Sequence, residues 1–276
     1  MASASSDNSI LLSARVSVRY AEKPVLRDVR LEIQSGEVLG LVGQSGSGKS
    51  TLAMAILGLL EKKRAQVEGS IHFQSSELLL LRERELRKLR GRAIALVLQS
   101  PLSSLNPALK IRTQLKEAWC AHASGTSAEC SDAIRASLQS VSLPCDDGFL
   151  KKYSSQMSVG QAQRVLIAMA VMHRPALLIA DEATSALDVI TQSEILKLFR
   201  ELNRSTGMAI LYISHDLASV AGICDRIAIL HQGEIVETGT TEQIFAHPQH
   251  DYTQRLMAAL PRIGQPNRKS EAATAK

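Results

Sequence analysis

The sequence predicts an α/β protein with a mainly parallel sheet, an N-terminal antiparallel β subdomain and an inserted α-helical subdomain. Short strand patterns fill residues 10–36, and apolar strands alternate with helices over residues 37–101 and again after residue 158. The intervening stretch, about 103–157, is polar and helical. Strands that alternate with helices are typical of parallel sheets, whose ligands bind beyond the carboxyl ends of the strands.

The elements of the first half follow from apolar patterns and turn residues. Residues 10–20 and 28–33 read as strands that end in a Ser-Gly-Glu turn. The next elements are expected in the order strand 37–43 (EVLGLVG), helix 49–60 (KSTLAMAILGLL), strand 69–74 (GSIHFQ), basic helix 77–92 and strand 93–98 (AIALVL).

Alternation resumes in the second half. Ser158 and Gln161 have the spacing of a capping box and predict a helix start. Helices then alternate with the strands 176–180 (ALLIA), 209–214 (AILYIS) and 226–230 (RIAIL). The stretch HQGEIVETG predicts a hairpin that turns at Gln232–Gly233.

Composition limits the function classes. The chain has 276 residues, 45% apolar content and a net charge of +5. This charge suits a phosphate ligand or an anionic membrane surface and does not demand nucleic acid. Aromatic residues make up 3% of the chain, which argues against a platform that stacks single-stranded bases.

The ends and the cysteines carry further expectations. Cys120, Cys130, Cys145 and Cys224 form no C-x-x-C pair, so we expect free thiols in a reducing compartment. The N-terminus lacks the pattern of a secretory signal, and the apolar runs are too short to span a bilayer. We expect a soluble protein, held at a membrane only by a partner, with disordered ends at residues 1–9 and 265–276.

GQSGSGKST, residues 43–51, follows a predicted strand and opens a predicted helix, which is the context of a phosphate-binding loop. Glycines let the backbone N–H groups face a phosphate, and the helix N-terminus favours an anion. Lys49 would bind the β- and γ-phosphates, and Ser50 would ligate Mg²⁺. The expected nucleotide-binding residues of this loop are Gly43, Ser45, Gly46, Gly48, Lys49, Ser50 and Thr51.

Polar side chains follow several of the apolar strands. Asp181 would hold Mg²⁺, and Glu182 is a candidate general base, although two acids can also mark a helix N-terminal turn. Gln99 could reach a metal or water, and His215 ends another strand, where a structural histidine is more common. Tyr20 could stack on a purine or be a half-buried strand residue.

Together these motifs resemble the nucleotide-binding subunit of an ABC transporter over residues 20–261. The resemblance identifies Tyr20 with the A-loop, Gln99 with the Q-loop and His215 with the switch histidine. It also identifies Met157–Gln161 with the signature, Leu177–Glu182 with Walker B and Ser185–Asp188 with the D-loop. ABC-type ATPases of nucleic-acid or translation machines are the alternative, but they need a long coiled coil or two such domains in one chain.

The resemblance implies ATP and Mg²⁺ as cofactors and one ABC-type ATPase domain over residues 10–264. Catalysis would depend on Glu182, His215 and Gln99. In the family two subunits sandwich ATP, so Ser158, Gly160, Gln161 and Asp188 would contact nucleotide at the shared interface. Val159 replaces a glycine of the family signature and predicts a slower site where this signature meets the partner.

LQSPLSSLNP and FAHPQHDYTQRLMAALP resemble the peptide/nickel importer subfamily. This implies two permease subunits, a second and non-identical ATPase subunit, and indirectly a solute-binding protein, with no nucleic acid. The chain would lie at the cytoplasmic face of the inner membrane and power import of a peptide, nickel or a metal chelate. No cysteine follows Cys224, so no iron–sulfur cluster is expected. Asp251 replaces the usual proline before Tyr-Thr.

Overall fold

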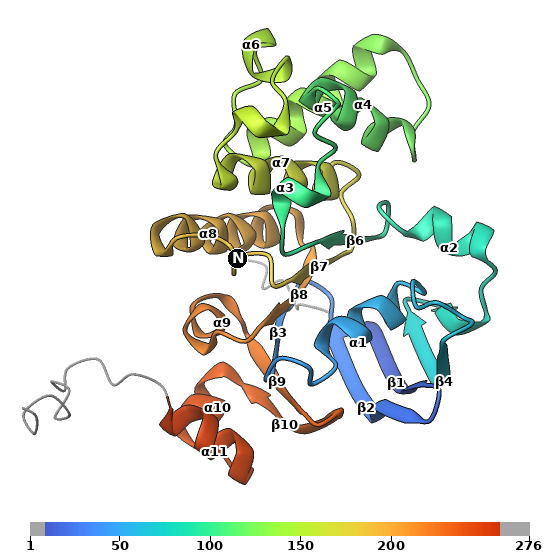
Figure 1. Ribbon diagram of the computed structural model, residues 1–276, viewed down its shortest axis with the longest axis vertical. Helices are drawn as coiled ribbons and strands as arrows, with labels where there is room; N and C mark the ends of the chain where they lie inside the picture. The colour runs from blue at the N-terminus through green and yellow to red at the C-terminus, as the bar shows by residue number, and fades with distance from the viewer. Residues whose placement is uncertain (1–8, 260–276) are drawn as a thin grey trace, which may run out of the picture.

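Two β-sheets organise residues 9–259, the part of the chain that the computed structural model describes (Figure 1). The smaller sheet is antiparallel, in the spatial order β2 (Lys23–Gln34), β1 (Ile10–Tyr20), β4 (Ala65–Phe73) and β5 (Ser76–Glu77). The larger sheet has the order β10 (Glu234–Thr240), β9 (Arg226–His231), β3 (Val38–Val42), β8 (Ala209–Ser214), β7 (Leu177–Asp181) and β6 (Ile94–Val97). Its strands pair in parallel except for β9 with β10, which confirms the expected fold class.

Helices connect these strands in chain order. They are α1 (Lys49–Ile56), the 3-10 helix η1 (Leu78–Leu80), α2 (Glu83–Leu89), α3 (Pro101–Ser104), α4 (Ile111–Cys120), α5 (Ser127–Ser140), α6 (Asp147–Leu150), the 3-10 helix η2 (Ser154–Gln156), α7 (Val159–Val171), α8 (Val189–Thr206), α9 (Leu217–Ile223), α10 (Thr241–Ala246) and α11 (Asp251–Ala258). None of the helices described within residues 9–259 has the length and apolar character needed to cross a bilayer.

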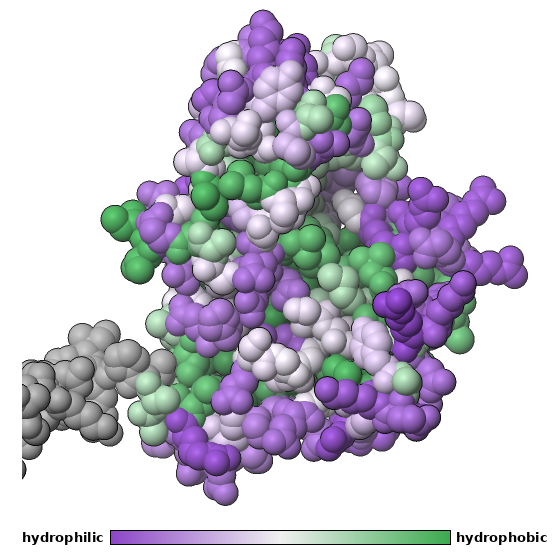
Figure 2. Space-filling model, in the orientation of Figure 1, coloured by the Kyte–Doolittle hydropathy of each residue, from purple (hydrophilic) through white to green (hydrophobic). Residues whose placement is uncertain are grey.

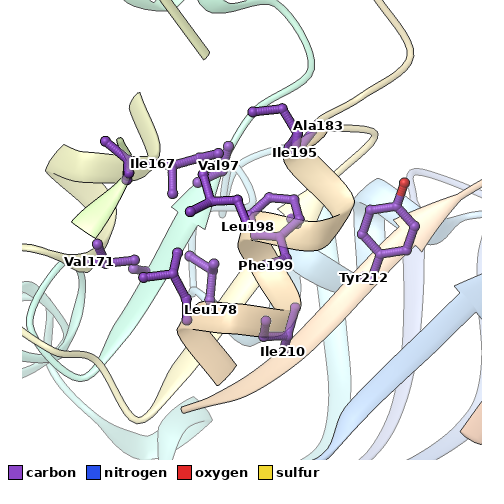
Figure 3. Packing of buried hydrophobic residues seen from close by; sticks show 14 of the residues in the cluster. Val97, Ile167, Val171, Leu178, Ala183, Ile195, Leu198, Phe199, Ile210 and Tyr212 are labelled. Atoms are coloured by element: carbon purple, nitrogen blue, oxygen red, sulfur yellow. The ribbon is translucent and has the colours of Figure 1, made fainter. Parts of the chain in front are cut away.

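The central strands are buried on both faces, as their continuous apolar sequences predict. Every residue of β3, β7 and β8 is buried. Leu177 and Ile179 pack with α1 and the antiparallel sheet, whereas Leu178 and Ala180 pack with the side chains of α7 and α8 (Figure 3). This period-two alternation fixes the register of the strands and therefore the position of the residues that follow them.

The hairpin between β9 and β10 turns where the sequence places it. Gln232 and Gly233 have φ values of 49° and 84°, and His231 pairs with Glu234. Positive φ at both central residues matches the right-handed twist of the flanking strands. The expectation of a turn at Gln232–Gly233 is confirmed.

Several expected boundaries were wrong. The helix expected over residues 49–60 ends at Ile56, and the strand expected over residues 69–74 starts at Ala65. The predicted helix 77–92 is α-helical only in α2, because Glu77 belongs to β5 and residues 78–80 form the 3-10 helix η1. The Glu77 carboxylate accepts hydrogen bonds from the N–H groups of Ile71 and Leu79, which stabilises this irregular start. The second strand starts at Lys23 rather than Asp28, since β1 and β2 continue to pair up to Tyr20 and Lys23.

Helices α3 to α6 lie between β6 and α7, in the stretch expected to form the helical subdomain (Figure 1). The division into subdomains near residues 103 and 157 stays a prediction. Asp251 is the first residue of α11, where an acidic side chain stabilises the helix N-terminus. The ends expected to be disordered lie outside the described residues, except for Ser9.

Candidate functional site

The loop between β3 and α1 is shaped by glycines at positions where a side chain would be strained or crowded. Gly46 and Gly48 have φ values of 79° and 110°. A Cβ atom on Gly43 would lie 2.2 Å from the carbonyl oxygen of Leu230, and one on Gly48 would lie 2.5 Å from Leu26 Cδ2. The loop therefore turns tightly against the sheet and presents its backbone at the N-terminus of α1, a position that favours anions.

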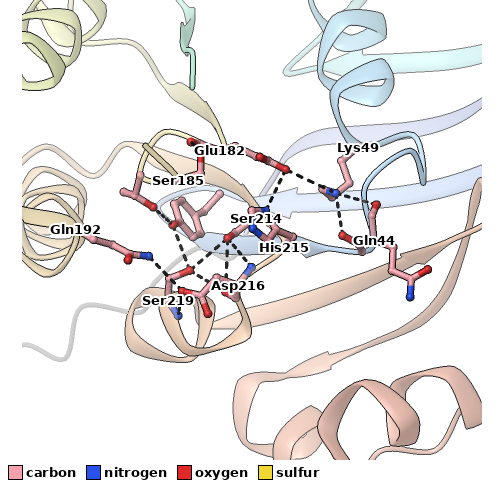
Figure 4. Close-up of polar contacts among 12 residues, drawn as sticks. Gln44, Lys49, Glu182, Ser185, Gln192, Ser214, His215, Asp216 and Ser219 are labelled. Carbon is pink, nitrogen blue, oxygen red and sulfur yellow. Dashed lines mark hydrogen bonds and ion pairs between the residues drawn. The ribbon is translucent and has the colours of Figure 1, made fainter. Parts of the chain in front are cut away.

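Lys49 is the buried cation of this loop, with 4% of its side chain exposed. Its Nζ atom donates to the carbonyl oxygens of Gly43 at 2.8 Å and Gln44 at 3.1 Å (Figure 4). Burial lowers the pKa of Lys49, and the nearby carboxylates of Glu182 and Asp181 oppose this shift. The loop therefore holds one positive charge next to two acids.

The loop faces a cleft of about 290 Å³. Three of the segments that line it were expected there and are far apart in sequence: the loop and start of α1, Gln99 after β6, and the acids at the end of β7. The expected residues among those lining it are Ser45, Gly46, Gly48, Lys49, Ser50, Thr51, Gln99, Asp181 and Glu182. Val25 also lines the cleft and was not expected there, since a valine in a strand carries no functional signal.

Asp181 is 6% exposed, and its Oδ1 atom has no hydrogen-bond partner among the described residues. Burial raises the pKa of Asp181, the Ser50 hydroxyl opposes this by hydrogen bonding, and the charges of Glu182 and Lys49 act in opposite directions. An unpartnered buried carboxylate oxygen beside a hydroxyl fits a hard cation such as Mg²⁺. Residues 9–259 contain no cluster of three His, Cys, Asp or Glu that could hold a metal, so such a cation would depend on Ser50 and on phosphate oxygens.

Glu182 joins three segments of the site (Figure 4). Its Oε1 atom lies 3.9 Å from Lys49 Nζ and 3.3 Å from His215 Nδ1. Its backbone has a φ of 48°, and its N–H donates to the carbonyl oxygen of Ile213 at 3.0 Å. The left-handed backbone ends β7 at Asp181 and turns the Glu182 side chain toward the loop.

A buried group of hydroxyls links the segment after β7 to the segment after β8. The hydroxyl of Tyr212 lies 2.8 Å from Thr184 Oγ1 and donates to Ser219 Oγ at 3.3 Å. Ser219 Oγ also lies 3.3 Å from Ser214 Oγ, which accepts from the N–H of Asp216 at 2.9 Å. Sequence reasoning missed this group because Tyr212 reads as one more apolar strand residue. The polar residues on either side of β8 were the only available signal.

The signature residues lie away from this cleft, at the start of α7. Ser158 Oγ accepts from the N–H of Gln161, and Gln161 Oε1 accepts from the N–H of Ser158, both at 3.2 Å, so the capping box is present. A Cβ on Gly160 would lie 2.7 Å from Thr191 Cγ2 of α8. Asp188 caps that helix and accepts from the Thr191 hydroxyl at 2.7 Å. The signature and the D-loop therefore lie together, apart from Lys49.

Tyr20 is half-buried at the end of β1, opposite Ala65 of β4. It packs against the core between the two sheets and is not among the residues that line the cleft. The two interpretations left open by the sequence, purine stacking and a plain strand position, both remain compatible with this placement.

Comparisons with known proteins agree with this geometry. Residues 26–185 match the family model described as ABC transporter, and residues 236–276 match the oligopeptide/dipeptide transporter C-terminal region. The dipeptide transport ATP-binding protein DppD of Haemophilus influenzae is 41% identical over 254 residues, which cover 91% of this chain and 77% of the relative. The glutathione import ATP-binding protein GsiA of Escherichia coli is 41% identical over 245 residues, or 87% of this chain and 39% of the relative.

The chain therefore spans about two fifths of the length of the glutathione import relatives that it matches. Among solved structures, the ATP-binding cassette MJ0796, dimeric and bound to ADP and Pi, has a TM-score of 0.72 and 27% identity, covering 83% of this chain and 98% of that one. The cbiO1 protein of Clostridium perfringens, part of the ABC transporter complex cbiONQ, has a TM-score of 0.75 and 26% identity, with 92% and 97% covered.

Proposed function

The chain belongs to the ABC transporter family, and on this premise we propose that it is the ATP-binding and ATP-hydrolysing subunit of an importer for small peptides. The observation that carries the proposal is the meeting of Lys49, Glu182 and His215 around one carboxylate oxygen, at the rim of a cleft built on a phosphate-binding loop. Seven motifs in the order of the family support it.

Each residue has a definite task in this function. Lys49 and the loop N–H groups bind the phosphates of ATP, because the helix N-terminus and the ammonium group stabilise negative charge there. Glu182 accepts the proton of the attacking water, and His215 holds the Glu182 carboxylate in place through Nδ1. Gln99, which also lines the cleft, orients the water.

Asp181 and Ser50 fit a divalent cation, as the unpartnered Oδ1 atom of Asp181 indicates. When bound, Mg²⁺ would neutralise the charge of the β- and γ-phosphates. The side-chain oxygen of Gln99, in the segment after β6, would be a third oxygen available to this cation. The nucleotide that this chemistry serves is ATP, and no guanine-recognition motif N-K-x-D occurs in the sequence.

The relatives named for dipeptide transport and glutathione import favour a peptide over nickel or a metal chelate as the solute. The match of residues 236–276 to an oligopeptide/dipeptide transporter region supports the same choice. These findings disfavour the alternative of an ABC-type ATPase that acts on nucleic acid or translation.

The proposed assembly contains two permease subunits, a second ATPase subunit that differs from this one, and a solute-binding protein that supplies the peptide. In this assembly the chain lies at the cytoplasmic face of the inner membrane. The signature residues Ser158, Gly160 and Gln161 and the D-loop residue Asp188 face the partner ATPase, which fits their position away from the chain's own cleft.

The function is tested by uptake in cells whose native copy is replaced by Lys49→Ala. We expect import of a labelled dipeptide or of glutathione to stop, while uptake of nickel stays unchanged. Loss of nickel uptake with intact peptide uptake would identify nickel, rather than a peptide, as the solute. No change in either would contradict the assignment to import.

A further inference from the structure

Most of the net positive charge of the chain lies in one short stretch. Residues 82–92 contain six basic and two acidic side chains, whereas the whole chain has a net charge of +5. Arg84, Arg87 and Lys88 are exposed and are spaced three and four residues apart on α2, so they share one face of the helix. Figure 2 shows a hydrophilic surface over α2, at the right of the view.

This face opens on a groove of about 1020 Å³ between α2 and the end of α4. Its lining contains five basic residues and one carboxylate, that of Glu83. Arg90 donates to both oxygens of this carboxylate, at 2.6 and 3.1 Å, which lowers the pKa of Glu83. Within residues 9–259 no carboxylate forms an ion pair with Arg84, Arg87 or Lys88, so their charges are available to a partner.

Arg90 also fixes α2 to the end of α1. Its Nε atom donates to the carbonyl oxygen of Leu57 at 2.7 Å, and its Nη2 atom to that of Gly58 at 2.9 Å. The loop after α1 therefore joins the same surface and adds Lys62 and Lys63, which are exposed. The charge of Lys62 reaches Glu83 and contributes to lowering its pKa.

Two exposed leucines border these charges. Leu80, the last residue of η1 and two residues short of α2, is 83% exposed, and Leu59, in the loop after α1, is 47% exposed. Exposed leucine beside lysine and arginine is typical of segments that lie in the interface of an anionic bilayer, where the apolar side chain enters the boundary and the cations meet headgroups. An acidic protein segment would pair with the cations and give Leu80 no role.

We propose that this basic surface, made of Leu59, Lys62, Lys63, Leu80, Arg84, Arg87 and Lys88, contacts the anionic phospholipid headgroups of the membrane. The contact goes beyond the proposed function, which places the chain at a membrane only through its permease partners. A second attachment at α2 would restrict how the subunit rotates relative to the bilayer.

The test is sedimentation of the purified full chain with vesicles, without nucleotide. We expect binding to vesicles of equal parts phosphatidylcholine and phosphatidylglycerol, and none to pure phosphatidylcholine. Raising the salt from about 0.1 M to 1 M shortens the screening length from about 10 Å to 3 Å and should release the protein. The triple variant Arg84→Gln/Arg87→Gln/Lys88→Gln should bind at least tenfold more weakly, since each basic residue near such a surface contributes about fivefold.

The matched control is Lys110→Gln/Lys151→Gln/Lys197→Gln, which changes the net charge equally on other surfaces and should bind like the parent. Leu80→Ser should weaken binding at the lower salt concentration, whereas Ile10→Ser, a change at another exposed apolar residue, should not. Equal weakening by the two triple variants would overturn the proposal, because it would show attraction by net charge alone. The proposal would also be overturned if the α2 triple variant changed transporter activity by the same amount in neutral and in anionic nanodiscs. This result would identify a protein segment, rather than lipid, as the partner of the basic surface. ATP hydrolysis by the same preparations reports on the proposed function independently.

Discussion

The Oε1 atom of Glu182 lies 3.3 Å from Nδ1 of His215, although the two residues follow different strands of the sheet. Because β7 and β8 pair in parallel, their carboxyl ends meet at one edge, and the left-handed backbone of Glu182 turns its side chain toward both His215 and Lys49. The Glu182 carboxylate therefore lies near both the phosphate-binding loop, at Lys49, and the segment after β8, at His215. This geometry makes the role of each partner separately testable.

Glu182→Gln should remove the proton acceptor while keeping the shape and hydrogen-bonding capacity of the side chain. We expect the rate of ATP hydrolysis to fall by about 10²–10⁴-fold, the usual cost of losing a general base. ATP binding should survive, and an ATP-bound dimer should accumulate on gel filtration. The measurement needs an assembled transporter whose other site is also disabled. Near-normal turnover in that background would assign the base to another residue.

Lys49→Ala should abolish productive MgATP binding at the site on this chain, because Lys49 is the one lysine among the residues that line the cleft. Tyr20→Ala should weaken binding much less, since an aromatic stacking contact contributes about 0.5–1.5 kcal/mol. Titration with a fluorescent ATP analogue compares the two variants directly. If both lose affinity equally, Tyr20 does more than stack on the base.

Tyr212→Phe should remove the phenol hydroxyl that forms hydrogen bonds with both Thr184 and Ser219. The ring stays buried in the core, and the free energy of unfolding should fall by about 1–3 kcal/mol, because buried partners lose a hydrogen bond. We expect kcat to fall with little change in KM for ATP, since no hydroxyl of this group lines the cleft. Tyr153→Phe, at an exposed tyrosine, is the control for loss of a phenol and should leave stability and kcat unchanged. A Tyr212→Phe protein with parental kcat would limit the group to a structural role.

The sequence predicted the sheet, the loop and the polar residues at strand ends, because these depend on local patterns: apolar runs, glycines before a helix, and carboxylates after a strand. It could not predict the bond between Tyr212 and Thr184, since that depends on which way one tyrosine points from a fully buried strand. The helix predicted at 77–92 was wrong at its start for a related reason. Glu77 binds the N–H of Ile71 on a neighbouring strand, a contact without a local signal.

Asp181→Asn should stabilise the protein at neutral pH and impair its use of Mg²⁺. Burial raises the pKa of Asp181 above its ordinary 3.8, so the folded state binds this proton more tightly than the unfolded state. For an acid shifted upward, stability is lost as the pH rises through the interval from the unfolded to the folded pKa, and the loss is complete above it. Because asparagine does not ionise, the variant does not lose this stability as the pH rises. In urea unfolding from pH 7 down to pH 3, the advantage of the variant should shrink toward the acid end. A constant difference would mean that Asp181 does not titrate with folding.

Val159 is the first residue of α7, directly after the Ser158 cap, and 37% of it is exposed. If the partner's nucleotide meets this helix N-terminus, the branched side chain stands beside the N–H groups that would receive the γ-phosphate. We therefore expect two unequal ATP sites in the assembled importer, the slower one being completed by this signature. Val159→Gly should raise the hydrolysis rate at that site.

The measurement of this effect requires the site on this chain's own Walker motifs to be silenced by Glu182→Gln, so that the remaining turnover reports only on the site that Val159 faces. Val159→Ala is the matched control: it removes the branch but keeps the helix, whereas glycine also loosens the first turn by an amount that is at most about 1 kcal/mol. A rise with both variants would assign the slow rate to crowding by the branched side chain. A rise with glycine alone would assign it to restriction of the backbone. If neither variant changes the rate, the exposed side chain of Val159 points away from the phosphate. Val159 would then not be a cause of unequal hydrolysis at the two sites.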